Sequence, residues 1–321
     1  MIKFKAGLCL AAIALALATQ PAFAQGLAGK TVKIVVPYAA GGTGDVVARV
    51  LAQAVTEKTG QGFIVEDRPG ASSIVGTEYA ARAAPDGTTV LLVENPFILS
   101  AIIFPGHYDA LTAFEPLCYV AATPAVLAVS SKSDIQTLAD FVKLAQSKAG
   151  AVSYGSTGPA SIAHIAGELL KRDAKADITY VPYPGSPPAM NATLSGTITA
   201  VMANYSDLKG QIDSGALRPI AVPAKKRSVA LPNVPTVAEN GFNDVEAAVW
   251  FGFVVPAKTP KDVIAQLSKY ISDAVTSPAV VERLKNQGMF INLFCGSDFG
   301  KFLAEEHRTY KEFTAEFNIK P

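Results

Sequence analysis

The 321-residue chain contains only three cysteines, and Cys9 lies inside an apolar N-terminal stretch. The other two, Cys118 and Cys295, are too few to build a disulfide-based scaffold, and neither belongs to a CxxC metal or redox motif. An oxidising compartment would permit one bridge between them. The sequence does not show whether their Cα atoms lie within reach of each other, so a bridge and two free thiols both stay open.

An excess of either charge is also absent, since 28 Lys and Arg residues stand against 27 Asp and Glu. Removal of an N-terminal leader with Lys3 and Lys5 would leave a nearly neutral protein. Nothing in this balance recruits nucleic acid or an anionic membrane surface. The one local basic run, Lys225-Lys226-Arg227, is typical of a solvated loop.

Long hydrophobic runs are missing after the N-terminus, where no stretch reaches ~18 uninterrupted apolar residues. At the N-terminus, Lys3 and Lys5 precede a short apolar run that ends at Pro21-Ala22-Phe23-Ala24. This combination predicts a signal peptide over residues 1–24, with an Ala-x-Ala cleavage site. We therefore expect a soluble mature chain, starting near Gln25, in the periplasm.

Motifs for catalysis are scarce. Ser161 and His164 share a helical face, but the sequence has no GxSxG nucleophile elbow. Gly42 and Gly44 nearly match the dinucleotide fingerprint, yet Val47 occupies its third glycine position. No spacing of histidines and carboxylates suggests a metal site. The sequence thus favours a binding protein without cofactor or metal over an enzyme, and a periplasmic hydrolase is the alternative.

The chain does contain a regular alternation of apolar strands and amphipathic helices, which predicts parallel sheets covered by helices. The first series places strands at 32–36, 63–66 and 88–93, with helices from 46 to Gly60 and over 74–83. The second series places helices at 138–146, 162–171, 188–194 and 208–213, and strands at 151–154, 178–181, 198–203 and 217–222. Three helices, at 260–275, 279–287 and 298–317, and one short strand end the chain.

Two apolar segments predict passages between two domains. The segment 114–129 is interrupted by Ala122-Thr123-Pro124, as expected of a strand that leaves one domain and enters another, and the chain returns through 249–255. We expect two doubly wound α/β lobes, with residues 25–122 and 250–321 in lobe 1 and residues 123–249 in lobe 2. Sheets of this kind bind ligands outside the carboxyl ends of their strands, which places the ligand cleft between the lobes.

The most informative loop, Pro37 to Asp45, joins the first strand to the first helix and contains Gly41-Gly42-Thr43-Gly44. Backbone N–H groups at a helix N-terminus, together with the helix dipole, bind an anion without a basic side chain. A Cβ at Gly42 would be expected to disturb these donors. The alternative is a tight turn in which Asp45 acts as a cap or a first-turn acid.

A second loop, residues 154–161, repeats this arrangement before the helix that contains His164. Ser156, Thr157 and Ser161 add hydroxyl donors that suit a carboxylate, and helix capping is their alternative role. We expect His164 to be structural or adjacent to the ligand instead of a base. Two helix N-termini would then face each other across the cleft.

Taken together with these loops, the whole mature chain resembles the Bug-type receptors, the extracytoplasmic solute-binding proteins of tripartite tricarboxylate transporters. The segments that carry the resemblance keep their order along the chain. They are Ile34-Val35-Val36-Pro37-Tyr38 with Gly41-Gly42 and Asp45, Val65-Glu66-Asp67-Arg68-Pro69-Gly70-Ala71, Ala84-Pro85-Asp86-Gly87-Thr88, Tyr154-Gly155-Ser156, His164-Ile165-Ala166-Gly167-Glu168-Leu169-Leu170, Val181-Pro182-Tyr183, Val234-Pro235-Thr236 and Trp250-Phe251-Gly252.

The resemblance implies a type II periplasmic-binding-protein fold whose lobes close on a small carboxylate. It also implies delivery to a membrane transporter of the tripartite tricarboxylate type, with an orphan carboxylate sensor as an alternative, and a monomeric protein. The ligand would be held by the Gly41-Gly42 and Ser156-Thr157 loops, flanked by Tyr38, and bounded at its far end by the region of Tyr183 and Asp207. The full candidate set is Tyr38, Ala40, Gly41, Gly42, Thr43, Asp45, Ser156, Thr157, Ser161, His164, Tyr183, Ser186 and Asp207.

The region that would contact the distal end of the ligand departs from the family pattern. Pro184, Pro187 and Pro188 stand where the family usually has a glycine-rich turn. The specificity of this end is therefore open. The ligand classes that remain are tricarboxylates, dicarboxylates, aromatic acids and acidic amino acids.

Overall fold

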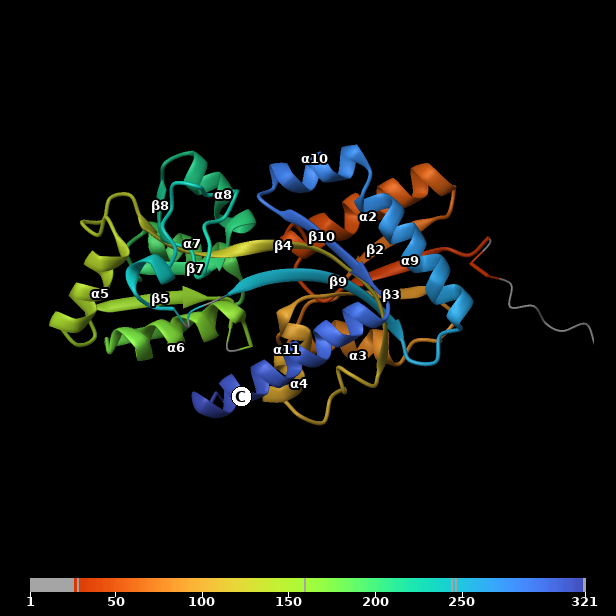
Figure 1. Ribbon diagram of the computed structural model, residues 1–321, viewed down its shortest axis with the longest axis horizontal. Helices are drawn as coiled ribbons and strands as arrows, with labels where there is room; N and C mark the ends of the chain where they lie inside the picture. Colours follow the sequence, from red (N-terminus) through yellow and green to blue (C-terminus); the bar gives the residue numbers. More distant parts are fainter. Residues whose placement is uncertain (1–25, 28, 159, 244, 246, 320–321) are drawn as a thin grey trace, which may run out of the picture.

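The sheet that organises the molecule runs through both lobes in the order β2-β1-β3-β9-β4-β7-β5-β6, with β8 and β10 each paired to β4. The computed structural model describes residues 26–27, 29–158, 160–243, 245 and 247–319. The predicted signal peptide lies outside the described residues. Figure 1 shows the two lobes side by side, with only β4 and β9 drawn as strands that pass between them.

The first lobe begins with three strands that pair in parallel, so that their carboxyl ends meet at one edge. A helix follows each strand, and the periodicity of the sequence predicts the first two of these helices. The strands are β1 (Val32–Val36), β2 (Phe63–Asp67) and β3 (Thr89–Val93), and the helices are α2 (Thr43–Thr59), α3 (Ile74–Ala81) and α4 (Asn95–Ile103). The sequence did not predict α4, because its residues are apolar nearly all round and show no amphipathic period.

The two predicted passages are confirmed as long strands, β4 (Phe114–Ser130) and β9 (Ala248–Pro256). They pair antiparallel from Phe114 opposite Pro256 to Pro124 opposite Ala248. From Ala125 onward, β4 exchanges β9 for β7 as its partner. Residues 117–129 of β4 are all buried, which fits a strand covered on both faces. This change of partner is consistent with a lobe boundary near residue 123, although the residue limits of the lobes stay a prediction.

The second lobe alternates helices and strands close to the predicted positions. Its elements are α5 (Leu138–Ser147), β5 (Val152–Ser156), α6 (Ile162–Ala174), β6 (Ile178–Pro182), α7 (Ser186–Leu194), β7 (Ala200–Asn204), α8 (Tyr205–Asp213) and β8 (Leu217–Ala221). Thr137 and Asp140 form the predicted capping box at the start of α5. Two of the unexpected prolines, Pro187 and Pro188, lie in the first turn of α7, where a missing N–H does not break a helical hydrogen bond.

The C-terminal part returns to the first lobe as α9 (Lys261–Val275), α10 (Pro278–Asn286), β10 (Phe290–Cys295) and α11 (Ser297–Glu316). β10 pairs antiparallel with β4, and Cys118 lies opposite Cys295 in that ladder. The two cysteines form a disulfide bond, with Cα atoms 4.0 Å apart. Among the described residues, no helix combines the length and the apolar composition that a membrane span requires.

Candidate ligand-binding cleft

The loop between β1 and α2 lies at the carboxyl edge of the first sheet, but its backbone donors are arranged differently from the prediction. Gly41 N–H donates to Asp45 Oδ2 at 2.8 Å, and Gly42 N–H points back to the carbonyl oxygen of Ala39 at 3.3 Å. Ala40 and Gly41 are exposed. The N–H groups of Thr43 and Gly44, in the first turn of α2, have no acceptor within the helix. These two residues are therefore the better placed backbone donors.

Asp45 makes the contacts expected of its alternative role, an acidic residue in the first turn of α2 that stabilises its own loop. It is 4% exposed and pairs with Arg49 at 2.6 Å. Burial opposes its ionisation, but the hydrogen bonds from Arg49 and Gly41 prevail and hold the pKa of Asp45 below its usual value.

The two lobes touch directly across the cleft. The hydroxyl of Thr43 on α2 donates to Asp207 Oδ1 at 2.6 Å and lies 3.0 Å from Ser206 Oγ. Asp207 also accepts a hydrogen bond from Ser186 at 2.7 Å, through Oδ2. Thr43, Ser186 and Asp207, three residues of the predicted set, thus form one hydrogen-bonded cluster that joins the two lobes.

The second predicted loop is tightly bonded around Ser161. Ser156 Oγ lies 3.0 Å from Ser161 Oγ, which also accepts from His164 N–H at 3.2 Å and caps α6. Thr157 is exposed. A ring carbon of Tyr183 lies 2.9 Å from the place a Cβ would take on Gly155. Tyr183 therefore packs on the strand end that precedes this loop.

His164 lies behind the loop instead of at its surface. Only 8% of His164 is exposed, and its ring stacks on the ring of Tyr180 with 3.9 Å between the ring centroids. The Ser161 hydroxyl accepts a hydrogen bond from the backbone N–H of His164. Capping of α6 is therefore the role that these contacts give Ser161.

Two features of the cleft were missed by the sequence analysis. Glu94 directly follows β3 and is 8% exposed; burial, with a contribution from the charge of Asp207, raises the pKa of Glu94 well above its usual value. The second is the turn before α3, where Ala71, Ser72 and Ser73 have φ angles of 45°, 50° and 77°. Three successive non-glycine residues in the left-handed region are uncommon and mark strain that the surroundings must sustain.

Buried hydroxyl groups gather beside this turn. Those of Tyr38, Ser73 and Thr77 are near one another, and none makes a well-formed hydrogen bond within the protein. Burial raises the pKa of Tyr38 well above its usual value, so its phenol is a neutral donor. Such groups are normally paired, which makes them candidate partners of a polar ligand or of water.

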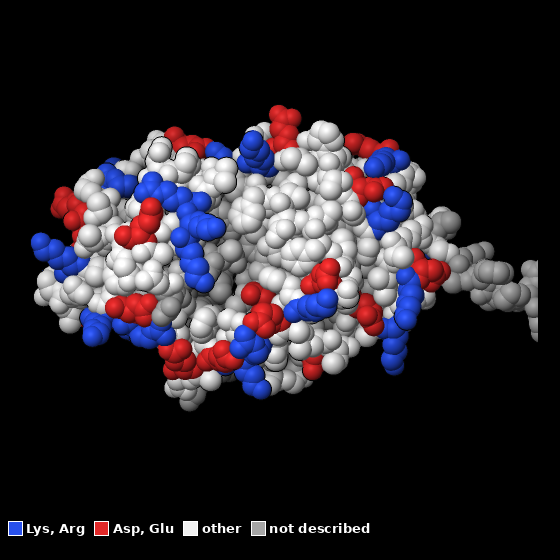
Figure 2. All heavy atoms as spheres, viewed as in Figure 1, with Lys and Arg blue, Asp and Glu red and all other residues white. Residues whose placement is uncertain are grey.

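A separate pocket of about 510 Å³ lies between the lobes on the side of α6 and α11. Figure 2 shows the surface hollowed between the lobes on this face, with charges of both signs scattered around it. Trp250, Phe302 and Phe313 give the pocket an aromatic wall, and Arg172 bridges the lobes by pairing with Glu316 at 2.5 Å. None of the predicted ligand residues, all of which the structure describes, lines this pocket.

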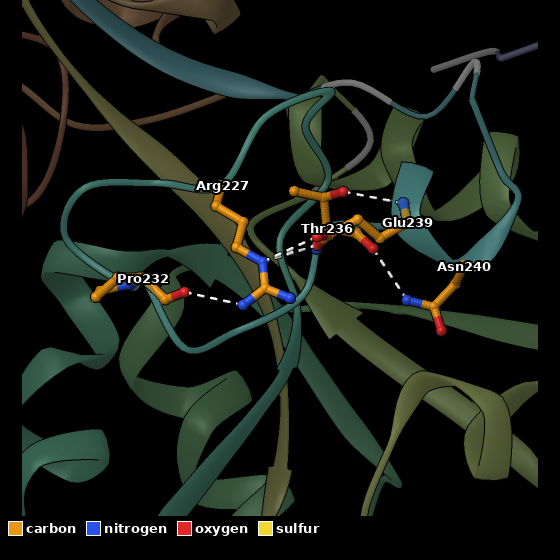
Figure 3. Close-up of polar contacts among 5 residues, drawn as sticks. All are labelled: Arg227, Pro232, Thr236, Glu239 and Asn240. Atoms are coloured by element: carbon orange, nitrogen blue, oxygen red, sulfur yellow. Dashed lines mark hydrogen bonds and ion pairs between the residues drawn. The ribbon is translucent and has the colours of Figure 1, made fainter.

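The basic run at residues 225–227 leads into a loop held by its own polar contacts (Figure 3). Arg227 pairs with Glu239 at 2.9 Å and donates to the Pro232 carbonyl at 3.0 Å. Thr236 and Glu239 bond each other's backbone N–H groups, and Asn240 donates to the Thr236 carbonyl. Arg227 and the Val234-Pro235-Thr236 motif therefore stabilise the conformation of this loop. In the described ranges, no three His, Cys, Asp or Glu side chains come together as a metal site would require.

Comparison with known proteins shows which family this chain resembles. A family model described as "Tripartite tricarboxylate transporter family receptor" matches residues 47–319. BugT of Bordetella pertussis is 31% identical over 303 residues, which cover 94% of this chain and 93% of that protein. The solved structure of R. palustris Rpa4515 with adipate has 28% identity and a TM-score of 0.85, covering 91% of this chain and 99% of its own.

A second solved structure, MatC (Rpa3494) from Rhodopseudomonas palustris with bound malate, has 25% identity and a TM-score of 0.80. The match covers 88% of this chain and 98% of that one. These similarities confirm the predicted fold and the family to which the sequence resemblance pointed. The chain belongs to the receptor family of the tripartite tricarboxylate transporters.

Proposed function

We propose that this protein is a periplasmic receptor that captures one small carboxylate between its lobes and delivers it to a tripartite tricarboxylate type transporter. The observation that carries the proposal is the meeting of the α2 N-terminus with the second lobe, through the hydrogen bond of Thr43 to Asp207. The adipate and malate bound to the similar proteins Rpa4515 and MatC support a carboxylate as the ligand.

Neutral donors would hold the anion. The first turn of α2 and the loop before α6 each offer N–H groups at a helix N-terminus, and the hydroxyls of Ser156 and Tyr38 lie beside them. A ligand that contacts both lobes binds the closed form better than the open one, and this difference drives closure. The proposal also includes the candidate ligand residues, the lobe limits, the signal peptide, a monomeric state and the absence of catalysis.

A panel of small carboxylates tests it by thermal denaturation. The panel contains malate, adipate, citrate, benzoate, aspartate and glutamate. We expect at least one to raise the melting temperature with a stoichiometry near one, because a ligand at 100 times its Kd stabilises the native state by about 2.7 kcal/mol. No shift with any of them, together with turnover of an ester or amide, would favour the hydrolase instead.

The contact across the cleft provides a second test. Thr43→Val keeps the shape of the side chain but removes its hydrogen bond to the Asp207 carboxylate, which is worth about 1.5 kcal/mol. We expect ligand affinity to fall about tenfold. Small-angle scattering of the saturated variant should show a less compact ensemble.

A matched control comes from the same kind of side chain inside one lobe. Thr193 donates to the Ala189 carbonyl within α7, so Thr193→Val should leave ligand affinity and compaction unchanged. Equal affinities for Thr43→Val and the wild type would show that the Thr43 contact plays no part in closure.

A further inference from the structure

Glu94 lies where the chain leaves β3 and faces the first turn of α2. Its Oε1 atom lies 2.6 Å from the place a Cβ would take on Gly44, and a Tyr38 ring carbon lies 3.3 Å from the same point. Thr43, the neighbour of Gly44, carries the hydrogen bond to Asp207. Glu94 therefore belongs to the same corner of the cleft as the α2 N-terminus, where we propose that the ligand binds.

No cation among the described residues pairs with this carboxyl group. Across the described part of the chain, Glu94 has neither an ion pair nor a side-chain hydrogen bond, although only 8% of the residue is exposed. The titratable groups that face it are Tyr38 from the β1–α2 loop, with Tyr108 behind it, and Asp207 from α8. All of them are neutral or acidic, so the surroundings favour the uncharged carboxylic acid.

An uncharged carboxylic acid is a hydrogen-bond donor, whereas an ionised one can only accept. Two carboxylates in contact repel each other and cannot both stay ionised in a site closed to water. A protonated acid facing a carboxylate instead forms a short, charge-assisted O–H···O⁻ bond. Glu94 can therefore contribute to anion binding only if it carries a proton.

We propose that Glu94 holds a proton in the closed cleft and donates it in a hydrogen bond to a carboxylate of the ligand, so that ligand capture is linked to proton binding. The inference rests on the proposed function. It explains how a cleft with Glu94 and Asp207 can hold an anion, and it assigns Glu94 as a residue that sets affinity.

The direction of the pH dependence follows from linkage. The ligand prefers the protonated form, so affinity is constant at pH values below the pKa of Glu94 in the free protein. Above that pKa it falls tenfold per pH unit, until the pKa of Glu94 in the complex is reached. Beyond this second pKa the affinity is constant again.

Glu94→Gln provides the test, because an amide donates an N–H at the same place at every pH. Calorimetry would measure the Kd of malate, adipate and any other carboxylate that stabilises the wild type, between about pH 6 and pH 10. We expect the variant to bind roughly tenfold more weakly than the wild type at acidic pH. Its affinity should not change with pH, so it should exceed that of the wild type at alkaline pH. Glu57→Gln, an exposed change on α2, is the control and should keep the wild-type profile.

Infrared difference spectra supply an independent readout. The carbonyl stretch of a protonated carboxylic acid should be present in the wild type, free and liganded, and absent from Glu94→Gln. Loss of binding by Glu94→Gln at every pH, with no such band in the wild-type complex, would overturn the inference and identify Glu94 as an ionised acceptor for a cationic group. If no carboxylate binds the wild type, the proposed function itself fails, while the spectra of the free protein still decide whether Glu94 is protonated.

Discussion

Replacing Cys118 and Cys295 together by alanine is expected to lower the free energy of unfolding by about 2–5 kcal/mol. The bridge joins residues 177 positions apart in the sequence. An intact bridge therefore removes much conformational freedom from the unfolded chain. It also fixes β10 to β4, which carries the passage between the lobes. Unfolding in urea, followed by circular dichroism, measures the loss.

The control for this prediction is the reductant. The wild type should become as unstable as the double variant in the presence of dithiothreitol, whereas the double variant should not respond. The unfolding midpoint of the wild type could instead be the same with and without reductant, although its thiols are fully reduced. This result would show that the bridge does not contribute to the free energy of unfolding.

Gly44→Ala is expected to have the largest effect on binding, a loss of roughly a hundredfold in affinity. A Cβ at this position would lie 2.6 Å from Glu94 Oε1, 3.2 Å from a Leu92 methyl carbon and 3.3 Å from the Tyr38 ring. Overpacking of this kind costs about 1–3 kcal/mol and displaces the groups that face the ligand. Calorimetric titration with a confirmed ligand measures the change in Kd.

Gly210→Ala is the matched control, because a Cβ on this residue of α8 would meet no atom within 4 Å. Alanine is the better helix former by about 0.5–1 kcal/mol, so this variant should be slightly more stable and bind normally. If Gly44→Ala retained wild-type affinity, the first turn of α2 would not be part of the binding site.

The sequence predicted more of the scaffold than of the cleft. Strand and helix periodicity located nearly every element, and the apolar segment 114–129 revealed the passage between lobes. The sequence placed the start of α8 at Leu208 instead of Tyr205, because the first turn of that helix has no apolar pattern. The pairing of Cys118 with Cys295 depends on the register of β10 against β4, which local sequence does not encode.

Within the cleft, the features that the sequence analysis missed are contacts between distant segments. The sequence pointed to Gly42 as a glycine at which a Cβ would disturb the backbone donors, and the φ of Gly42 is an ordinary −74°. The close approach occurs at Gly44 and depends on Glu94, which follows β3 much later in the sequence. Glu94 directly follows β3, so the rule that ligands bind at the carboxyl ends of strands includes its position. Local sequence could not show that its side chain points into the cleft and lacks a cation.

The position of β9 also bears on how the chain acquires its structure. β9 lies between β3 and β4 in the middle of the sheet, although it is the ninth of the ten strands in the described part of the chain. Until residues 248–256 have been synthesised, β3 and β4 therefore each lack the strand that pairs with both of them, and the sheet of the first lobe is incomplete. A nascent chain in this state is slow to fold, because the pairing that completes its core spans most of its length. The first lobe can therefore complete its core only after nearly four fifths of the chain has been made, whereas the strands β5 to β7 of the second lobe pair without β9.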